Sequence, residues 1–213
     1  RIDAPDGPPR AWALFAHCFS CSKDILAAQR IAKRLSSLGI GVVRFDFTGL
    51  GHSEGDFANT NFSSNVADLG VAASRMKTVR AVVTVGAPSD AEHVIHNFSS
   101  HIEEIETEGK AEVSLAGRPF TIRKQFLDDV RGTRVRDAAA DLKKPLLVMH
   151  SPIDQTVGID NATGLFIAAK HPKSFVSLDT ADHLISRAED AAYAAECISG
   201  WVSRYLPVSE EGS

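Results

Sequence analysis

Several features that would assign this chain to a particular class are scarce or missing. No apolar run in its 213 residues approaches the roughly 18 residues that span a membrane, and no secretory leader pattern is visible. Basic residues are not in excess: 23 Lys and Arg stand against 27 Asp and Glu, a formal charge of −4. Three cysteines are too few for a disulfide scaffold and fit a reducing compartment. We therefore expect a cytoplasmic protein that binds neither membrane nor nucleic acid.

What is present is typical of a globular domain. Hydrophobic residues make up 44% of the chain and charged residues 23%, which excludes disorder, collagen and coiled coil. The length suits a single domain over residues 1–213. No internal repeat or low-complexity segment appears.

Short apolar runs alternate with helical patterns along most of the chain. The pattern predicts strands at residues 11–17, 41–47, 79–85, 145–150 and 174–178, and helices at 23–38 (capped by Ser22), 61–76 (capped by Ser63 or Ser64), 160–169 and 187–205. Strands that are apolar throughout, alternating with helices, are typical of a mostly parallel sheet covered on both faces. The expected fold class is therefore α/β.

One stretch, residues 90–141, interrupts the alternation because it is more charged and mixed. Residues 110–122 alternate in polarity around Ala116-Gly117-Arg118, which predicts a β-hairpin. An insertion over the carboxyl end of a parallel sheet usually forms a lid at the ligand site. The alternative is a solvated surface excursion.

An acid and an imidazole follow two consecutive predicted strands. Asp154 comes just after strand 145–150, and His183 comes just after strand 174–178. Because carboxyl ends of parallel strands share one edge, we expect the two side chains to form a hydrogen bond of about 2.6–3.2 Å. Asp154 would orient the imidazole, which would take a proton from a nucleophile. Ordinary surface or capping roles are the alternative.

The first strand ends at His17-Cys18-Phe19. A turn at this place can aim a backbone N–H at a developing oxyanion, and we expect the Phe19 amide to be that donor. The alternative is an ordinary strand-to-helix turn.

These residues carry a family resemblance. The chain resembles the α/β-hydrolases, and among them the small bacterial members often fused to an OsmC-like domain. The matching phrases are ALFAHCFSCSKD (13–24), VVRFDFTGLGHSEGDFANTNFSSNVADL (42–69), AVVTVGAPSD (81–90), GRPFTIRKQFLDD (117–129), LLVMHSPIDQTVGIDNA (146–162) and KHPKSFVSLDTADHLIS (170–186).

The resemblance implies hydrolysis of an ester or similar small acyl substrate through an acyl-enzyme, without a cofactor. Asp154 matches the acid and His183 the base, while Cys18 and Phe19 match the oxyanion loop, in which Cys18 stands where Gly is commoner. A downstream OsmC-like domain is a possible partner. The first alternative is a non-catalytic binding or scaffold module with the same fold.

The family's nucleophile elbow is absent from this sequence. It consists of a strand, a G-x-S-x-G turn that carries the Ser, and a helix, which need roughly 25 residues. Here Met76 is followed at once by Lys77 and the strand at 79–85. Gly51-His52-Ser53-Glu54-Gly55 satisfies the pattern, but it lacks a strand directly before it and a helix directly after it. Ser20 to Lys23 satisfies S-x-x-K, but no accompanying S-D-N or K-T-G is present.

Cys18 and Cys21 form a C-x-x-C motif between a strand and a helix. A thioredoxin-like redox pair occupies such a place, so a thiol redox protein is the second alternative. If they are ordinary loop thiols, no disulfide joins them and Cys18→Ser leaves the fold intact. His93, His96 and His101 lie at no metal-ligand spacing, so no metal site is expected.

The missing elbow has a physical consequence. By resemblance its strand lies between the strands at 11–17 and 79–85. Its removal would leave a slot of about 9.6 Å and two ladders without partners, each lost bond costing about 1–3 kcal/mol. Set against a total stability near 5–15 kcal/mol, this favours a segment that belongs between Met76 and Lys77. The alternative is a natural or engineered deletion with a rearranged sheet. We predict a break at this junction, beside the two strands and near His183; direct pairing of the two strands would contradict it.

Overall fold

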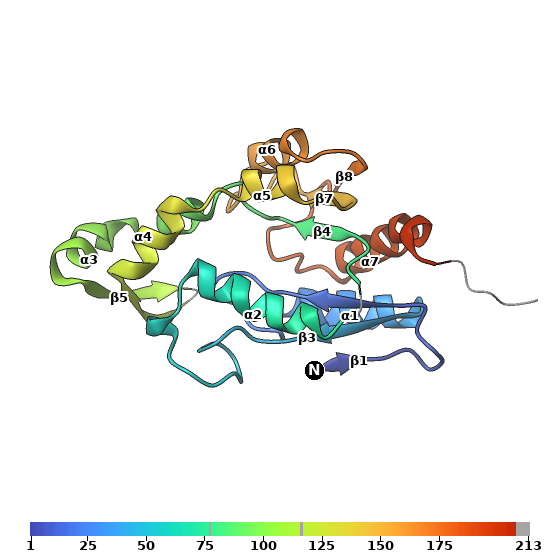
Figure 1. Ribbon diagram of the computed structural model, residues 1–213, viewed down its shortest axis with the longest axis horizontal. Coiled ribbons are helices and arrows are strands. Elements are labelled where there is room, and N and C mark those ends of the chain that lie inside the picture. Colours follow the sequence, from blue (N-terminus) through green and yellow to red (C-terminus); the bar gives the residue numbers. More distant parts are fainter. Residues whose placement is uncertain (77, 116, 208–213) are drawn as a thin grey trace, which may run out of the picture.

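The parallel strands of this protein fall into two separate sheets (Figure 1). The computed structural model describes residues 1–76, 78–115 and 117–207. One sheet has the order β1-β3-β2 and the other β4-β7-β8. All pairs in these sheets are parallel except β1 with β3. The strands are β1 (Ile2–Asp3), β2 (Ala11–Phe15), β3 (Ile40–Arg44), β4 (Val82–Val85), β7 (Leu146–His150) and β8 (Lys173–Ser177).

Helices lie on both faces of these strands, so the expected α/β class is confirmed. On one face, α1 (Leu26–Ser37) and α7 (Ala188–Val202) bury small and branched residues against β3 and β7. On the other face, α6 (Asp160–Ala168) and α5 (Val135–Asp141) pack near Leu146 and Val148. The last strands and helices follow one another in the predicted order, β7, α6, β8 and α7.

Two details of the predicted helix caps are wrong. Helix α1 begins after Ile25 with no side-chain cap, because Ser22 lies too far upstream and its hydroxyl accepts from the Asp24 amide instead. Helix α2 (Phe62–Ser74) is capped by Asn61, and Ser64 completes a reciprocal capping box. The asparagine oxygen reaches the Ser64 amide at 2.7 Å, so the serine is the partner of the cap.

The insertion at 90–141 forms a second hydrophobic core together with the loop that follows β3. It contains η2 (Ala91–His101), α3 (Ile102–Glu108), the antiparallel hairpin of β5 (Lys110–Leu115) and β6 (Arg118–Arg123), α4 (Lys124–Gly132) and α5. The predicted hairpin is therefore confirmed, although Ala116 in its turn lies outside the described residues. Phe98, Ile105 and Leu127 pack with Phe47 and Phe57 of the main body. The insertion is attached to the loop that follows β3, and its role as a lid stays a prediction.

The two sheets are separated where the missing strand was expected. Among the described residues, no strand pairs with the free edge of β2 or of β4. In Figure 1, β4 lies with α5, α6 and β7 in the upper half, and α1, α2 and β3 lie in the lower half. Direct pairing of β2 with β4, which would have contradicted the omission of a segment, is therefore not observed. The predicted break itself involves Lys77, which lies outside the described residues.

Burial beside the separation is incomplete. Every residue of β7 is buried, whereas β4 is only half-buried along its length. Helix α2 buries none of its residues, and its Val66 and Val71 are 53% and 65% exposed. The hydroxyl of Thr84 in β4 is buried without a hydrogen-bond partner in the described part of the chain. Strand β4 and helix α2 therefore contain apolar residues typical of a protein core, but part of this apolar surface is exposed.

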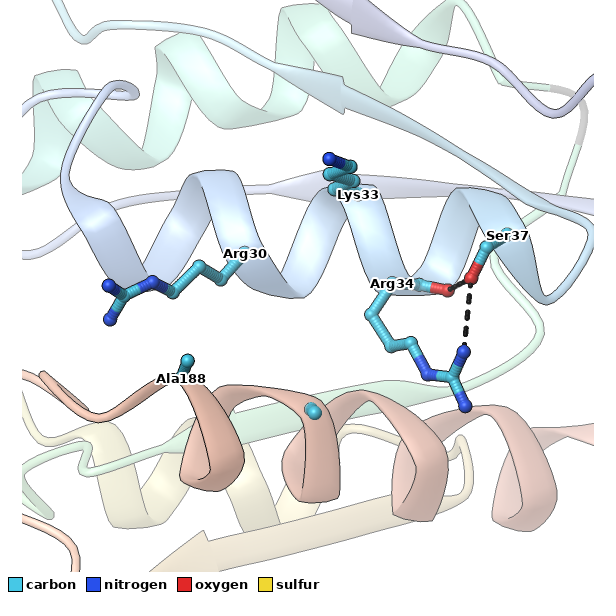
Figure 2. A pocket seen from close by; sticks show the side chains of 6 residues that line it. Arg30, Lys33, Arg34, Ser37 and Ala188 are labelled. Carbon is cyan, nitrogen blue, oxygen red and sulfur yellow. Dashed lines mark hydrogen bonds between the residues drawn. The ribbon is translucent and has the colours of Figure 1, made fainter.

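A groove of about 340 Å³ runs between α1 and α7 (Figure 2). Two of its cationic side chains have partners on or near α7: Arg34 donates to Glu196 at 2.6 Å, and Arg30 donates to the Ser186 carbonyl. Figure 2 shows Lys33 pointing away from α7. The groove is thus a seam between two packed helices. None of the described helices is long and apolar enough to cross a membrane.

Candidate active site

Asp154 and His183 meet as the strand order predicts. Asp154 lies in the loop after β7, and His183 lies in the loop after β8. Nδ1 of His183 donates to Oδ2 of Asp154 at 2.8 Å, which confirms the expected hydrogen bond. The Asp154 side chain is 2% exposed, whereas the imidazole is 22% exposed. The acid is enclosed and the base is open to solvent on one side.

Hydrogen bonds hold Asp154 in its ionised form. Burial acts to raise the pKa of this carboxyl, but hydrogen bonds from the Val157 amide, from His183 and from the Thr156 amide outweigh it and lower the pKa. The two amides donate to Oδ1 at 2.9 and 2.8 Å, which leaves Oδ2 for the imidazole. With Nδ1 of His183 donating, Nε2 carries the free lone pair. The pair can therefore accept a proton at Nε2.

Gly86 is part of this site and was missed by sequence reasoning. It follows β4 directly and has a φ of 57°, which glycine adopts at little cost. A Cβ at this position would lie 3.6 Å from Asp154 Oδ2 and 3.6 Å from His183 Nδ1. The end of β4 therefore borders the Asp154–His183 pair. The available signal was a glycine immediately after a β-branched strand.

A second group of polar contacts fixes the loop after β2. The imidazole of His17 donates from Nδ1 to the Cys18 carbonyl at 2.8 Å and accepts at Nε2 from the Phe47 amide at 3.3 Å. Burial is the largest influence on His17 and lowers its pKa, which keeps the ring neutral. Asp46, almost fully buried, accepts from the Lys23 amide at 2.6 Å and from the Lys23 ammonium. The loops after β2 and β3 are thus bound to each other.

This arrangement leaves the Phe19 amide without a hydrogen bond to any group in the described residues. The Phe19 ring packs against Phe57 and against Phe126 of the insertion, with centroids 5.6 and 5.0 Å away. Arg118 of β6 donates to the Ser20 carbonyl. A fixed loop with a free amide can bind an oxyanion, and the insertion contacts that loop directly.

Cys18 and Cys21 do not conform to the expectation of separate loop thiols. The structure joins them in a disulfide, so the prediction of no disulfide is wrong. The physical reason is the tight turn, in which the Cys21 amide donates to the Cys18 carbonyl at 3.2 Å and the Cα atoms lie 5.3 Å apart. This separation is within the range that disulfides span.

Replacing Cys18 by Ser is expected to keep the fold. A disulfide that closes so short a loop restricts the unfolded chain little, so the free energy of unfolding should fall by about 2 kcal/mol or less. Urea unfolding of the variant beside the parent protein measures the difference, and Cys197→Ser, at the free cysteine, is the matched control. Loss of cooperative unfolding in Cys18→Ser alone would contradict the expectation.

Asp46 predicts a specific loss of stability in acid. Burial raises its pKa, but hydrogen bonds from the Lys23 amide and ammonium and from the His52 amide dominate and lower the pKa from 3.8 to about 2. A carboxyl whose pKa is lower in the folded state stabilises the fold above pH 4, and this stabilisation is lost as the pH falls toward 2. The shift corresponds to about 2 kcal/mol.

Asp46→Asn should remove that pH dependence. At neutral pH it should also lower the free energy of unfolding by about 3 kcal/mol, because it leaves the Lys23 ammonium without its buried partner. Urea titrations at several pH values between 2 and 7 measure both effects. Asp6→Asn, at an exposed position, should change neither.

The structure offers no nucleophile to His183 among the residues it describes. Ser53 of the G-x-S-x-G string donates to the Asp46 carbonyl at 2.6 Å, in the loop after β3. No hydroxyl or thiol in residues 1–76, 78–115 and 117–207 is hydrogen-bonded to Nε2 of His183. The same residues contain no cluster of three His, Cys, Asp or Glu side chains that could hold a metal ion.

Comparison with solved structures identifies the class that this fold and site define. The esterase domain of a Rhodothermus marinus protein is 40% identical over 97% of this chain and 92% of its own, with a TM-score of 0.73. Est1E from Butyrivibrio proteoclasticus with bound ferulic acid is 16% identical over 96% of this chain and 94% of its own, with a TM-score of 0.72. Mouse alpha/beta hydrolase domain-containing protein 10 is 16% identical over 96% and 93%, also with a TM-score of 0.72.

At 40% identity over nearly its full length, this chain belongs to the α/β-hydrolase family. The two more distant structures support the fold alone. No protein-family model and no curated protein matches the sequence.

Proposed function

We propose that this α/β-hydrolase cleaves an ester-type acyl substrate with Asp154 and His183 as two members of a Ser-His-Asp triad. The 2.8 Å hydrogen bond between them carries the proposal, because it leaves Nε2 of an oriented, partly exposed imidazole free to accept a proton. The nucleophilic Ser is supplied by a segment that belongs between Met76 and Lys77.

The proposed reaction has two stages. His183 takes the Ser proton as the hydroxyl oxygen attacks the ester carbonyl, and the Phe19 amide stabilises the oxyanion that forms. The same imidazole then gives its proton to the departing alcohol, and the acyl group remains on Ser. A water molecule repeats the sequence and releases the acid. Asp154 stays ionised and stabilises the imidazolium in both stages.

Three observations support the position of the missing segment. Among the described residues, the free edges of β2 and β4 have no strand on them, and Thr84 of β4 has a buried hydroxyl without a hydrogen-bond partner. The end of β4 borders the acid–base pair at Gly86, so a strand beside β4 would end next to His183. The exposed apolar residues of α2 are a surface that a following helix would cover.

Two measurements on the protein produced from its gene test the proposal. The intact mass should exceed 22.9 kDa by several kDa, and a fluorophosphonate probe should add once, at a Ser in the additional segment. Labelling should disappear after the protein is unfolded. A mass of 22.9 kDa without labelling would overturn the proposal.

A mass of 22.9 kDa without labelling would favour a non-catalytic α/β-hydrolase-like module, which binds a small molecule or supports a neighbouring OsmC-like domain. The absence of a nucleophile beside His183 in the described residues is the observation that favours it. A thiol redox function is the third candidate, favoured by the Cys18–Cys21 disulfide. Reduction and reoxidation of that bond by a thioredoxin-type reductant, followed by thiol titration, would distinguish it from the other two.

A further inference from the structure

A second imidazole lies beside the acid of the candidate active site. His150 is the last residue of β7, and its side chain is fully buried. Its Nε2 lies 2.7 Å from the Val157 carbonyl oxygen. Because a carbonyl oxygen can only accept, Nε2 carries the proton, and Nδ1 of the same ring carries a lone pair. The contact therefore fixes the tautomer and the orientation of the ring.

The other ring nitrogen, Nδ1, makes histidine energetically unfavourable at this position. Nδ1 of His150 is buried and has no hydrogen-bond partner among the described residues. A buried polar atom without a partner costs free energy that an apolar residue of similar size would avoid. An imidazole at this position needs a compensating role. The hydrogen bond from Nε2 provides one, because an apolar side chain cannot donate to the Val157 carbonyl.

That bond closes the turn that holds Asp154. The Val157 amide donates to Oδ1 of Asp154 at 2.9 Å, and the Val157 carbonyl accepts from His150 at 2.7 Å. Both backbone polar groups of Val157 are thus held, its N–H by the acid and its C=O by the imidazole. Nε2 of His150 also lies 3.7 Å from Oδ2 of Asp154, the oxygen that His183 binds.

We propose that His150 is a positioning residue that directs the Asp154 carboxylate toward His183 by holding the Val157 carbonyl. It does so through the turn at residues 154–157 and has no contact with the reacting atoms. The positioning is a property of the fold, whereas its effect on turnover rests on the proposed hydrolase function.

Three variants of His150 test the bond. In His150→Gln the terminal amide can donate from about the position of Nε2, so the turn should be preserved. In His150→Phe the ring shape is kept without a donor. In His150→Asn the amide is polar but one methylene shorter, so it cannot reach the Val157 carbonyl. The Phe and Asn variants should therefore behave alike, and the comparison between Asn and Gln decides the result if the Phe variant fails to fold.

The readout is the proton on Nδ1 of His183, observed by NMR as a downfield resonance, with Asp154→Asn as the reference for its loss. We expect solvent exchange of this proton to be roughly tenfold faster in the Phe and Asn variants and within twofold of the parent in the Gln variant. Unchanged exchange in Asn and Phe would overturn the proposal, and so would equal acceleration in all three variants, which would indicate packing alone.

This measurement does not depend on turnover, so it separates the positioning role from the proposed function. If the protein hydrolyses esters, His150→Asn should lower kcat with little change in KM, and His150→Gln should restore it. If the protein has no esterase activity, the proton exchange rates still test the proposal. Positioning without activity would leave the role of His150 intact and overturn only the hydrolase function.

Discussion

A segment of about 25 residues inserted between Met76 and Lys77 is expected to raise ester hydrolysis by roughly 10³–10⁶-fold over the 213-residue chain. The insert consists of a strand, a Gly-x-Ser-x-Gly turn and a helix. The physical reason is that the acid and base are already joined at 2.8 Å and border the end of β4, so a strand on that edge places its Ser beside His183. Initial rates on short-chain nitrophenyl esters measure the effect.

The matched control is the same insert with Ala in place of Ser. Both inserted chains should unfold at a higher temperature than the chain without the segment, because the strand pairs with β2 and β4 and the helix covers α2. Only the Ser-containing chain should hydrolyse the ester. A stabilised but equally inactive Ser-containing chain would show that the segment fits the fold while His183 is not its base.

In the active protein, Asp154→Asn is expected to lower kcat by about 10⁴-fold with little change in KM. An amide at this position can still bond to the ring, but it stabilises the wrong tautomer of His183 and cannot stabilise the imidazolium. His183→Ala should cause a loss of at least the same size, because it removes the group that transfers the proton. Because the two residues act as one unit, the double variant should be no slower than the worse single variant.

Two further variants serve as controls for the Asp154→Asn and His183→Ala measurements. Asp160→Asn removes an exposed acid from α6 and should leave kcat unchanged. Ser53→Ala removes the hydroxyl of the G-x-S-x-G string in the loop after β3, which donates to the Asp46 carbonyl. Full activity in Ser53→Ala excludes that string as the nucleophile, whereas a loss equal to that of His183→Ala would make Ser53 the reacting residue.

The pairing of Asp154 with His183 could be predicted from the sequence, because it depends only on the order of strands and loops along the chain. Asp154 and His183 each follow an apolar run, and the parallel arrangement of those runs brings their carboxyl ends together. Helices α1, α2, α6 and α7 and the hairpin at β5 and β6 were predictable for a similar reason, since their periodicity is contained within each element. The helices of the insertion were not predicted. Element ends were less predictable, and the cap of α2 depended on which of several neighbouring polar residues met the free amides.

Contacts that join distant loops could not be read in this way. The ion pair of Lys23 with Asp46 and the approach of Gly86 to the acid are set by how segments from different parts of the chain align. The bond from His150 to Val157 is local, but it depends on the conformation of the turn after β7. The Cys18–Cys21 bond depended on the conformation of one turn, which the C-x-x-C spacing permits but does not require. The two partners of each contact show no common pattern in the sequence, so only the folded structure reveals that they meet.

The free edges of β2 and β4 also bear on the behaviour of the chain in solution. An uncovered strand edge presents a row of unpaired N–H and C=O groups that another molecule's strand can adopt as a template, and proteins usually guard such edges with charge, proline or a bulge. Neither Ala11–Phe15 nor Val82–Val85 contains a charged residue or a proline. A molecule with both edges open therefore carries two unguarded nucleation points for aggregation, and the strand that completes the sheet would remove both of them at once.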